Sequence, residues 1–243
     1  MSTQICRGFT DNQWQGLKKN LVKGGGVQND AASWDCAIKV FERRMRERFL
    51  SCIEALQRAD SKQDVEVADD APPDCSTLPK DDDDKTVVPG FAILALCCLL
   101  VETLASFRDA PAPLAQPGGP CPYPKGNCIK PQPPGSGKRI MDFLQRPSFG
   151  DAFADPKVAR DFYDGIRCAI FHDAETRHWL ILRERPKNQI IERDGDQYIL
   201  NRTMFYQALR QEFESYLGDL RDSNNVELRK SFVEKMDNIV EKC

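Results

Sequence analysis

The sequence predicts a mainly α protein, a helical bundle with a small β-hairpin inserted before its fourth helix. Two observations support this fold class. Apolar residues recur every three or four positions over several long stretches, which is the pattern of helices with one buried face. One short region instead holds runs of strand-forming residues around an Asp-Gly-Asp turn at 194–196.

Length and charge limit the class of protein. The 243 residues suffice for one large domain or two small ones. A net charge of −3 argues against a surface wholly adapted to nucleic acid, but allows a local basic patch. Residues 1–10 lack the basic start and apolar run of a signal peptide. The strongest apolar run, 91–101, is eleven residues long, and crossing a bilayer takes about 20. We therefore expect a soluble cytoplasmic protein with no membrane contact.

The first predicted helix is long and follows a loosely ordered segment, residues 1–30, in which Gly24–Gly26 breaks any helix. We expect residues 31–243 to form a single domain that begins with this helix, which spans about Ala32 to Ala59. The apolar face of the helix comprises Trp34, Ile38, Phe41, Met45, Phe49, Cys52, Ile53 and Leu56. Its other face carries Lys39, Arg43, Arg44, Arg46 and Arg48. These cations form either a solvated face or a basic strip that meets a polyanion.

The second predicted helix, Gly90 to Arg108, lies between two irregular regions. Residues 60–86 form an acidic linker, whose Asp81–Lys85 string resembles an engineered protease site and carries no functional meaning here. Residues 109–137 form a proline-rich insertion. Because the helix is apolar nearly all round, we expect it at the centre of the bundle. Glu102, near its end, either points to solvent or reaches a basic group in a site.

Metal and nucleotide sites find little support in the sequence. The ten cysteines include no CxxC pair, and no histidine lies at zinc-finger distance, so we expect no metal and no cofactor. Cys121 and Cys128 could pair in an oxidising compartment. The Gly135–Lys138 stretch lacks the first glycine and the final Ser/Thr of a phosphate loop, so we reject that site.

The third predicted helix starts at Asp155 or Pro156 and ends near His172. Strand-like runs follow at 178–182, 189–192 and 197–200. Asn201 then caps a fourth helix, and Ser223 caps a last one.

The third helix carries the candidate site. With about 100° per residue, Val158, Phe162, Ile166 and Ala169 form its core face. Arg167, His172, Asp164 and Glu175 then form a polar stripe that faces away from the core. An arginine can hold a phosphate and a histidine can move protons near neutral pH. Arg167 and His172 lie about 140° apart on an ideal helix, which favours a site completed by a neighbouring helix or partner subunit. The simpler alternative is a solvated arginine and a histidine that interacts with the helix dipole.

The stretch Tyr163 to His172 resembles the signature of the HEPN superfamily, an arginine and a histidine separated by a short apolar spacer, four residues long here. The resemblance implies a HEPN-like helical bundle and a metal-independent endoribonuclease, often a homodimer. It assigns catalysis to Arg167 and His172. Asp164 or Glu175 would orient the histidine, and Glu102 would support the arginine. The implied partners are RNA, a second copy and a regulatory protein, in a toxin or antiviral defence role.

One departure from the HEPN pattern bears on catalysis. Cys168 follows the arginine where many catalytic members have Asn, Asp or His, and a thiol is a weaker hydrogen-bonding group. The sequence therefore also allows a non-catalytic HEPN-like module that binds RNA, nucleotide or protein. A purely structural or assembly protein is the third alternative.

Overall fold

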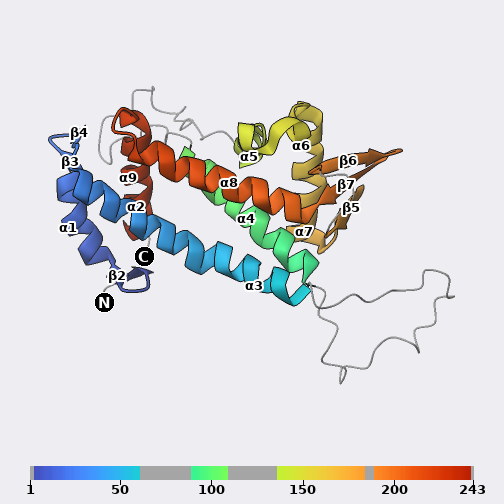
Figure 1. The fold of residues 1–243 in the computed structure, drawn as a ribbon, viewed down its shortest axis with the longest axis horizontal. Coiled ribbons are helices and arrows are strands. Elements are labelled where there is room, and N and C mark those ends of the chain that lie inside the picture. Colours follow the sequence, from blue (N-terminus) through green and yellow to red (C-terminus); the bar gives the residue numbers. More distant parts are fainter. Residues whose placement is uncertain (1–2, 61–88, 109–135, 184–188, 242–243) are drawn as a thin grey trace, which may run out of the picture.

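The computed structural model describes residues 3–60, 89–108, 136–183 and 189–241, and the described part is mainly helical (Figure 1). Residues 61–86 of the predicted linker and 109–135 of the predicted insertion lie outside the described residues, as do Cys121 and Cys128. The mainly α class is confirmed.

The first long helix is confirmed, with one interruption of its hydrogen-bond pattern. Helix α2 (Ala31–Met45) continues through a π-helical turn, η1 (Arg46–Leu50), into α3 (Ser51–Asp60). A π turn bonds i to i+5, so it rotates every later residue relative to a uniform α-helix. This explains why Cys52, predicted on the core face, is exposed while Ile53 is buried. Arg44 of the predicted basic face is also buried, and its Nη1 donates to the Ile5 carbonyl at 2.7 Å.

Helix α4 (Gly90–Arg108) is the central helix, as predicted, and contacts α3, α8 and α9 (Figure 1). Among the described residues, it is the one helix whose length and apolar composition would suit a membrane span, and 56% of its apolar window is buried in the molecule.

The prediction that residues 1–30 are loosely ordered was wrong for the described residues of that segment. They form β1 (Gln4–Cys6), β2 (Phe9–Thr10), α1 (Asp11–Leu21), β3 (Val22–Lys23) and β4 (Gly26–Val27). Trp14 and Leu21 are fully buried, and Trp14 Nε1 donates to Asp237 Oδ1 at 2.8 Å. Gly24 and Gly25 have positive φ and make the β3–β4 turn, so the glycines serve a hairpin here.

The predicted third helix exists, and an unpredicted helix precedes it. Helix α5 (Ser136–Leu144) and the 3₁₀ segment η3 (Pro147–Phe153) lead into α6 (Pro156–Phe162), a π segment η4 (Tyr163–Cys168) and α7 (Ala169–Asp173). The Asp155 carboxylate caps α6 by accepting from the Lys157 amide at 2.8 Å.

The predicted hairpin is part of a three-stranded sheet ordered β5-β7-β6. Strands β6 (Ile191–Asp194) and β7 (Gln197–Asn201) form the hairpin, and β5 (Trp179–Leu182) pairs parallel to β7. The Asn201 side chain caps α8 (Arg202–Arg221), as predicted. The Ser223 cap was wrong: α9 (Val226–Glu241) starts later, and the Arg229 amide donates to the Asn225 carbonyl.

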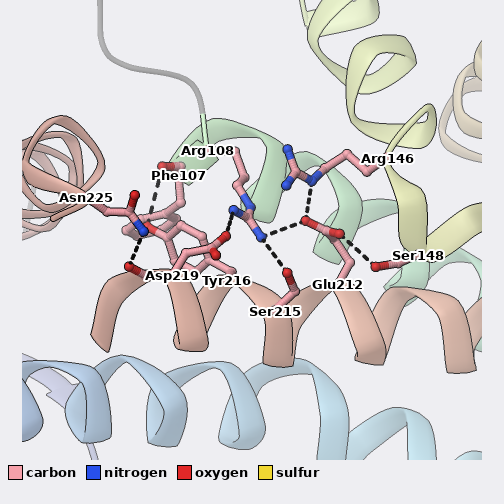
Figure 2. A network of polar contacts seen from close by, with 9 residues as sticks. All are labelled: Phe107, Arg108, Arg146, Ser148, Glu212, Ser215, Tyr216, Asp219 and Asn225. Carbon is pink, nitrogen blue, oxygen red and sulfur yellow. Dashed lines mark hydrogen bonds and ion pairs between the residues drawn. The ribbon is translucent and has the colours of Figure 1, made fainter. Parts of the chain in front are cut away.

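Aromatic rings and one polar network join these helices. Phe41 contacts Phe107, Phe213, Tyr216 and Phe232 between α2, α4, α8 and α9. Figure 2 shows Arg108 and Arg146 both reaching Glu212, which also accepts from Ser148 Oγ at 2.8 Å. Glu212 is 1% exposed, so these bonds satisfy a buried carboxylate.

Candidate functional site

Arg167 and Glu102 are brought together by α4 and the π segment η4. Arg167 Nη2 lies 2.7 Å from Glu102 Oε2, and the side chains are 21% and 33% exposed. Burial lowers the pKa of Arg167, but the hydrogen bond and charge of Glu102 outweigh this, so its pKa is raised overall. The sequence left open whether Glu102 points to solvent. Glu102 instead contacts Arg167, the arginine that the resemblance expects it to support.

Two aromatic rings complete the surroundings of Arg167. Its guanidinium carbon lies 5.2 Å from the centre of the Phe171 ring and 6.0 Å from that of Tyr163. These residues stand four positions after and before Arg167, the spacing at which helical side chains meet. Sequence reasoning missed both, although this spacing was available. The cation is held by a carboxylate and two rings, so its position is fixed.

Gly165 explains how η4 packs against the sheet. Its carbonyl accepts from the Arg177 amide at 2.8 Å. A Cβ at this position would lie 2.6 Å from the Arg177 carbonyl oxygen and 2.9 Å from Trp179 Cδ1. Only glycine permits this close approach, which fixes the segment carrying Arg167.

His172 lies one turn further along, in the last turn of α7. It is exposed, and its side chain makes no hydrogen bond or ion pair within the described part of the chain. The helix ends at Asp173, and Ala174 follows in the left-handed conformation. The imidazole is therefore accessible to a ligand, but none of the residues that the structure describes aligns it with Arg167.

The remaining predicted site residues do not join this pair. Asp164 faces the sheet, where it lines a cavity of about 520 Å³ with Lys157, Asp161, His178 and Tyr198. Glu175 is exposed beyond the end of α7, and Cys168 is a half-buried free thiol. The predicted single polar stripe was wrong, because the π segment departs from 100° per residue and turns Arg167 toward α4.

Cys98 lies one turn before Glu102 on α4 and is almost fully buried. Burial raises the pKa of its thiol to about 12, which Arg167 partly opposes. A thiol this hard to ionise is a poor nucleophile, so Cys98 is a poor candidate for chemistry at this site.

Comparison of the chain with protein-family models, with curated proteins and with solved structures finds no match. Within the described residues, no group of three or more His, Cys, Asp or Glu side chains is placed to hold a metal ion.

Proposed function

We propose that this protein is a metal-independent, HEPN-like endoribonuclease whose catalytic residues are Arg167 and His172. The observation that supports this best is the guanidinium of Arg167 held by Glu102 at 2.7 Å, with an accessible imidazole later on the same helix. An arginine fixed in this way can bind a phosphate and stabilise the negative charge that develops on it.

The reaction uses the ribose of the substrate as nucleophile. His172 takes the proton of a 2′-hydroxyl, and the 2′-oxygen forms a bond to the adjacent phosphorus. The bond from phosphorus to the 5′-oxygen breaks, and that oxygen takes a proton from an imidazolium. The products carry a 2′,3′-cyclic phosphate and a 5′-hydroxyl. DNA lacks the attacking hydroxyl and is not cut.

A second copy of the chain completes this site in our proposal. Arg167 points toward α4 while His172 is exposed beyond it, with no contact between the two side chains among the described residues. Two copies facing one another would supply one imidazole as base and the other as acid. We therefore expect a homodimer acting on RNA in the cytoplasm, in a toxin or defence role.

The test is cleavage of mixed RNA in EDTA by the wild type and by His172→Ala. We expect 2′,3′-cyclic phosphate ends with the wild type and at least a 100-fold loss with His172→Ala, in line with the usual effect of a proton-transfer group. The matched control is His178→Ala, which removes the other exposed histidine of the chain. Equal activity in all three proteins, or equal loss in both variants, contradicts the assignment.

The second candidate is a non-cleaving HEPN-like module that binds RNA, nucleotide or protein. The observation in its favour is that Glu102 already occupies one amino group of Arg167, beside a cysteine in place of the usual polar residue. It predicts RNA binding that weakens with salt and is unchanged in His172→Ala. Cleavage that depends on His172 excludes it.

A further inference from the structure

Glu102 also lines a basic cavity. Its volume is about 380 Å³. The residues that line it include Arg44, Arg48, Phe49, Glu102, Arg139 and Lys235. Four of these side chains are cations and one is a carboxylate, in a chain whose net charge is −3. This excess of positive charge favours an anionic ligand.

Two cations of the predicted basic strip, Arg44 and Arg48, line the cavity, and the other three lie on the outer face of the same helix. On that face, Lys39 pairs with Asp35 at 2.6 Å, and Arg43 and Arg46 pair with Glu47 and Glu42 at 3.0 Å. Each outer cation therefore has an acid one turn away. Among the residues that line the cavity, four are cations and one, Glu102, is a carboxylate.

The cavity is built from five separate elements. Arg44 and Arg48 come from α2 and η1, Glu102 from α4, Arg139 from α5 and Lys235 from α9. Glu102 connects the cavity to the catalytic arginine, because it lines the cavity and binds Arg167. Both π-helical segments thus supply an arginine near Glu102, Arg48 from η1 and Arg167 from η4. Such π turns occur frequently at functional sites.

We propose that the basic cavity binds the phosphate backbone of single-stranded RNA and leads it to Arg167. This inference rests on the proposed function. Arg48, Arg139 and Lys235 come from three elements, and cations spread in this way suit successive phosphates of a strand better than one small anion. Phe49 adds a half-buried ring beside these cations, and a cationic groove with an aromatic side chain is the usual composition of single-strand sites. Stacking of a base on this ring favours a single strand over an acidic peptide.

The probe is a fluorescein-labelled single-stranded RNA of about 12 nucleotides with 2′-O-methyl groups. The methyl groups block the attacking oxygen, so fluorescence anisotropy measures binding without cleavage. Full-length Arg48→Ala is compared with Lys39→Ala, which removes one cation from the same long helix at an exposed and paired position. Arg48→Lys is the conservative variant, and thermal melting checks that each protein folds.

We expect Arg48→Ala to weaken binding about fivefold at low salt and to reduce the slope of log affinity against log salt by about 0.7. Arg48→Lys should restore most of the binding, and Lys39→Ala should match the wild type. Equal affinities of Arg48→Ala and Lys39→Ala would overturn the proposal, and so would an absence of RNA binding by the wild type. Tighter binding of an oligo-aspartate peptide than of RNA would overturn it in favour of a protein partner.

The same variants separate this inference from the ribonuclease proposal. Binding that depends on Arg48, without any cleavage of unmodified RNA, supports the phosphate path and contradicts the catalytic assignment. Cleavage that depends on His172 but is unchanged in Arg48→Ala supports the catalytic assignment and contradicts the phosphate path.

Discussion

At the scale of single residues, the position of Glu102 is the most informative. It is a carboxylate on a helix that is otherwise nearly all apolar, and an unpaired charge there would be costly. The sequence reduced its role to two alternatives, solvent or a basic partner. Choosing between them required the position of Arg167, which is 65 residues away in the chain. The helix alone therefore predicted that Glu102 matters, and its partner Arg167 was indicated by the resemblance and not by the helix itself.

Substitution of Glu102 by Gln keeps the side-chain shape and removes the charge. The pair is partly exposed, so we expect the free energy of unfolding to change by less than about 1 kcal/mol. Cleavage of RNA should fall about tenfold or more, because Arg167 loses the group that orients it. Binding of the 2′-O-methyl RNA should tighten slightly, since the cavity loses its single acid. The control is Glu42→Gln on the outer face of α2, and a cleavage rate unchanged by Glu102→Gln would contradict a positioning role.

At the scale of elements, periodicity predicted which segments are helical but not how they are wound. The apolar spacing correctly placed Phe162, Ile166 and Ala169 on the buried face of the third helix. It assumed a constant 100° per residue, and two π segments violate this assumption. Each π turn offsets the residues within and beyond it from a uniform α-helix, which explains why Cys52 and Arg167 were misplaced. Nothing in the residue types of 46–50 or 163–168 identifies a π turn.

Gly165 provides a test of how η4 and the sheet pack together. Gly165→Ala should destabilise the protein by about 2 kcal/mol, because the added Cβ would overlap the Arg177 carbonyl. Gly218→Ala in α8 is the matched control. There a Cβ meets nothing within 4 Å, so the substitution should stabilise the helix by about 0.5–1 kcal/mol. Urea unfolding of both variants measures the difference. Opposite signs are expected, and stabilisation by both would show that the close approach is absent.

At the scale of the whole molecule, contacts between segments that are distant in the chain determine features of the fold that could not be predicted from the sequence. Trp14 bonds to Asp237 across nearly the entire chain, which orders a segment that looked irregular on its own. The basic cavity likewise combines Arg48, Arg139 and Lys235, whose separations in the chain give no local pattern. Helix-forming stretches and one acid–base pair could be expected from the sequence, but a surface assembled from several helices depends on the tertiary fold.

The Glu212 network tests whether the helices act as one folding unit. Glu212 on α8 accepts from Arg108 on α4 and from Arg146, which follows α5, so one carboxylate joins three parts of the molecule (Figure 2). Glu212→Ala removes a buried acid from two arginines, of which Arg108 still pairs with Asp219, and should cost about 3 kcal/mol. Glu214→Ala, two residues along α8, removes an exposed acid and should change stability by less than about 0.5 kcal/mol.

Calorimetry at neutral pH measures both Glu212→Ala and Glu214→Ala. We expect a single cooperative transition at a lower temperature for Glu212→Ala, because the loosened contacts extend through the aromatic core that α4 shares with α8. A second, separate transition would mean that the region around η3 unfolds independently and that the network joins two units rather than one.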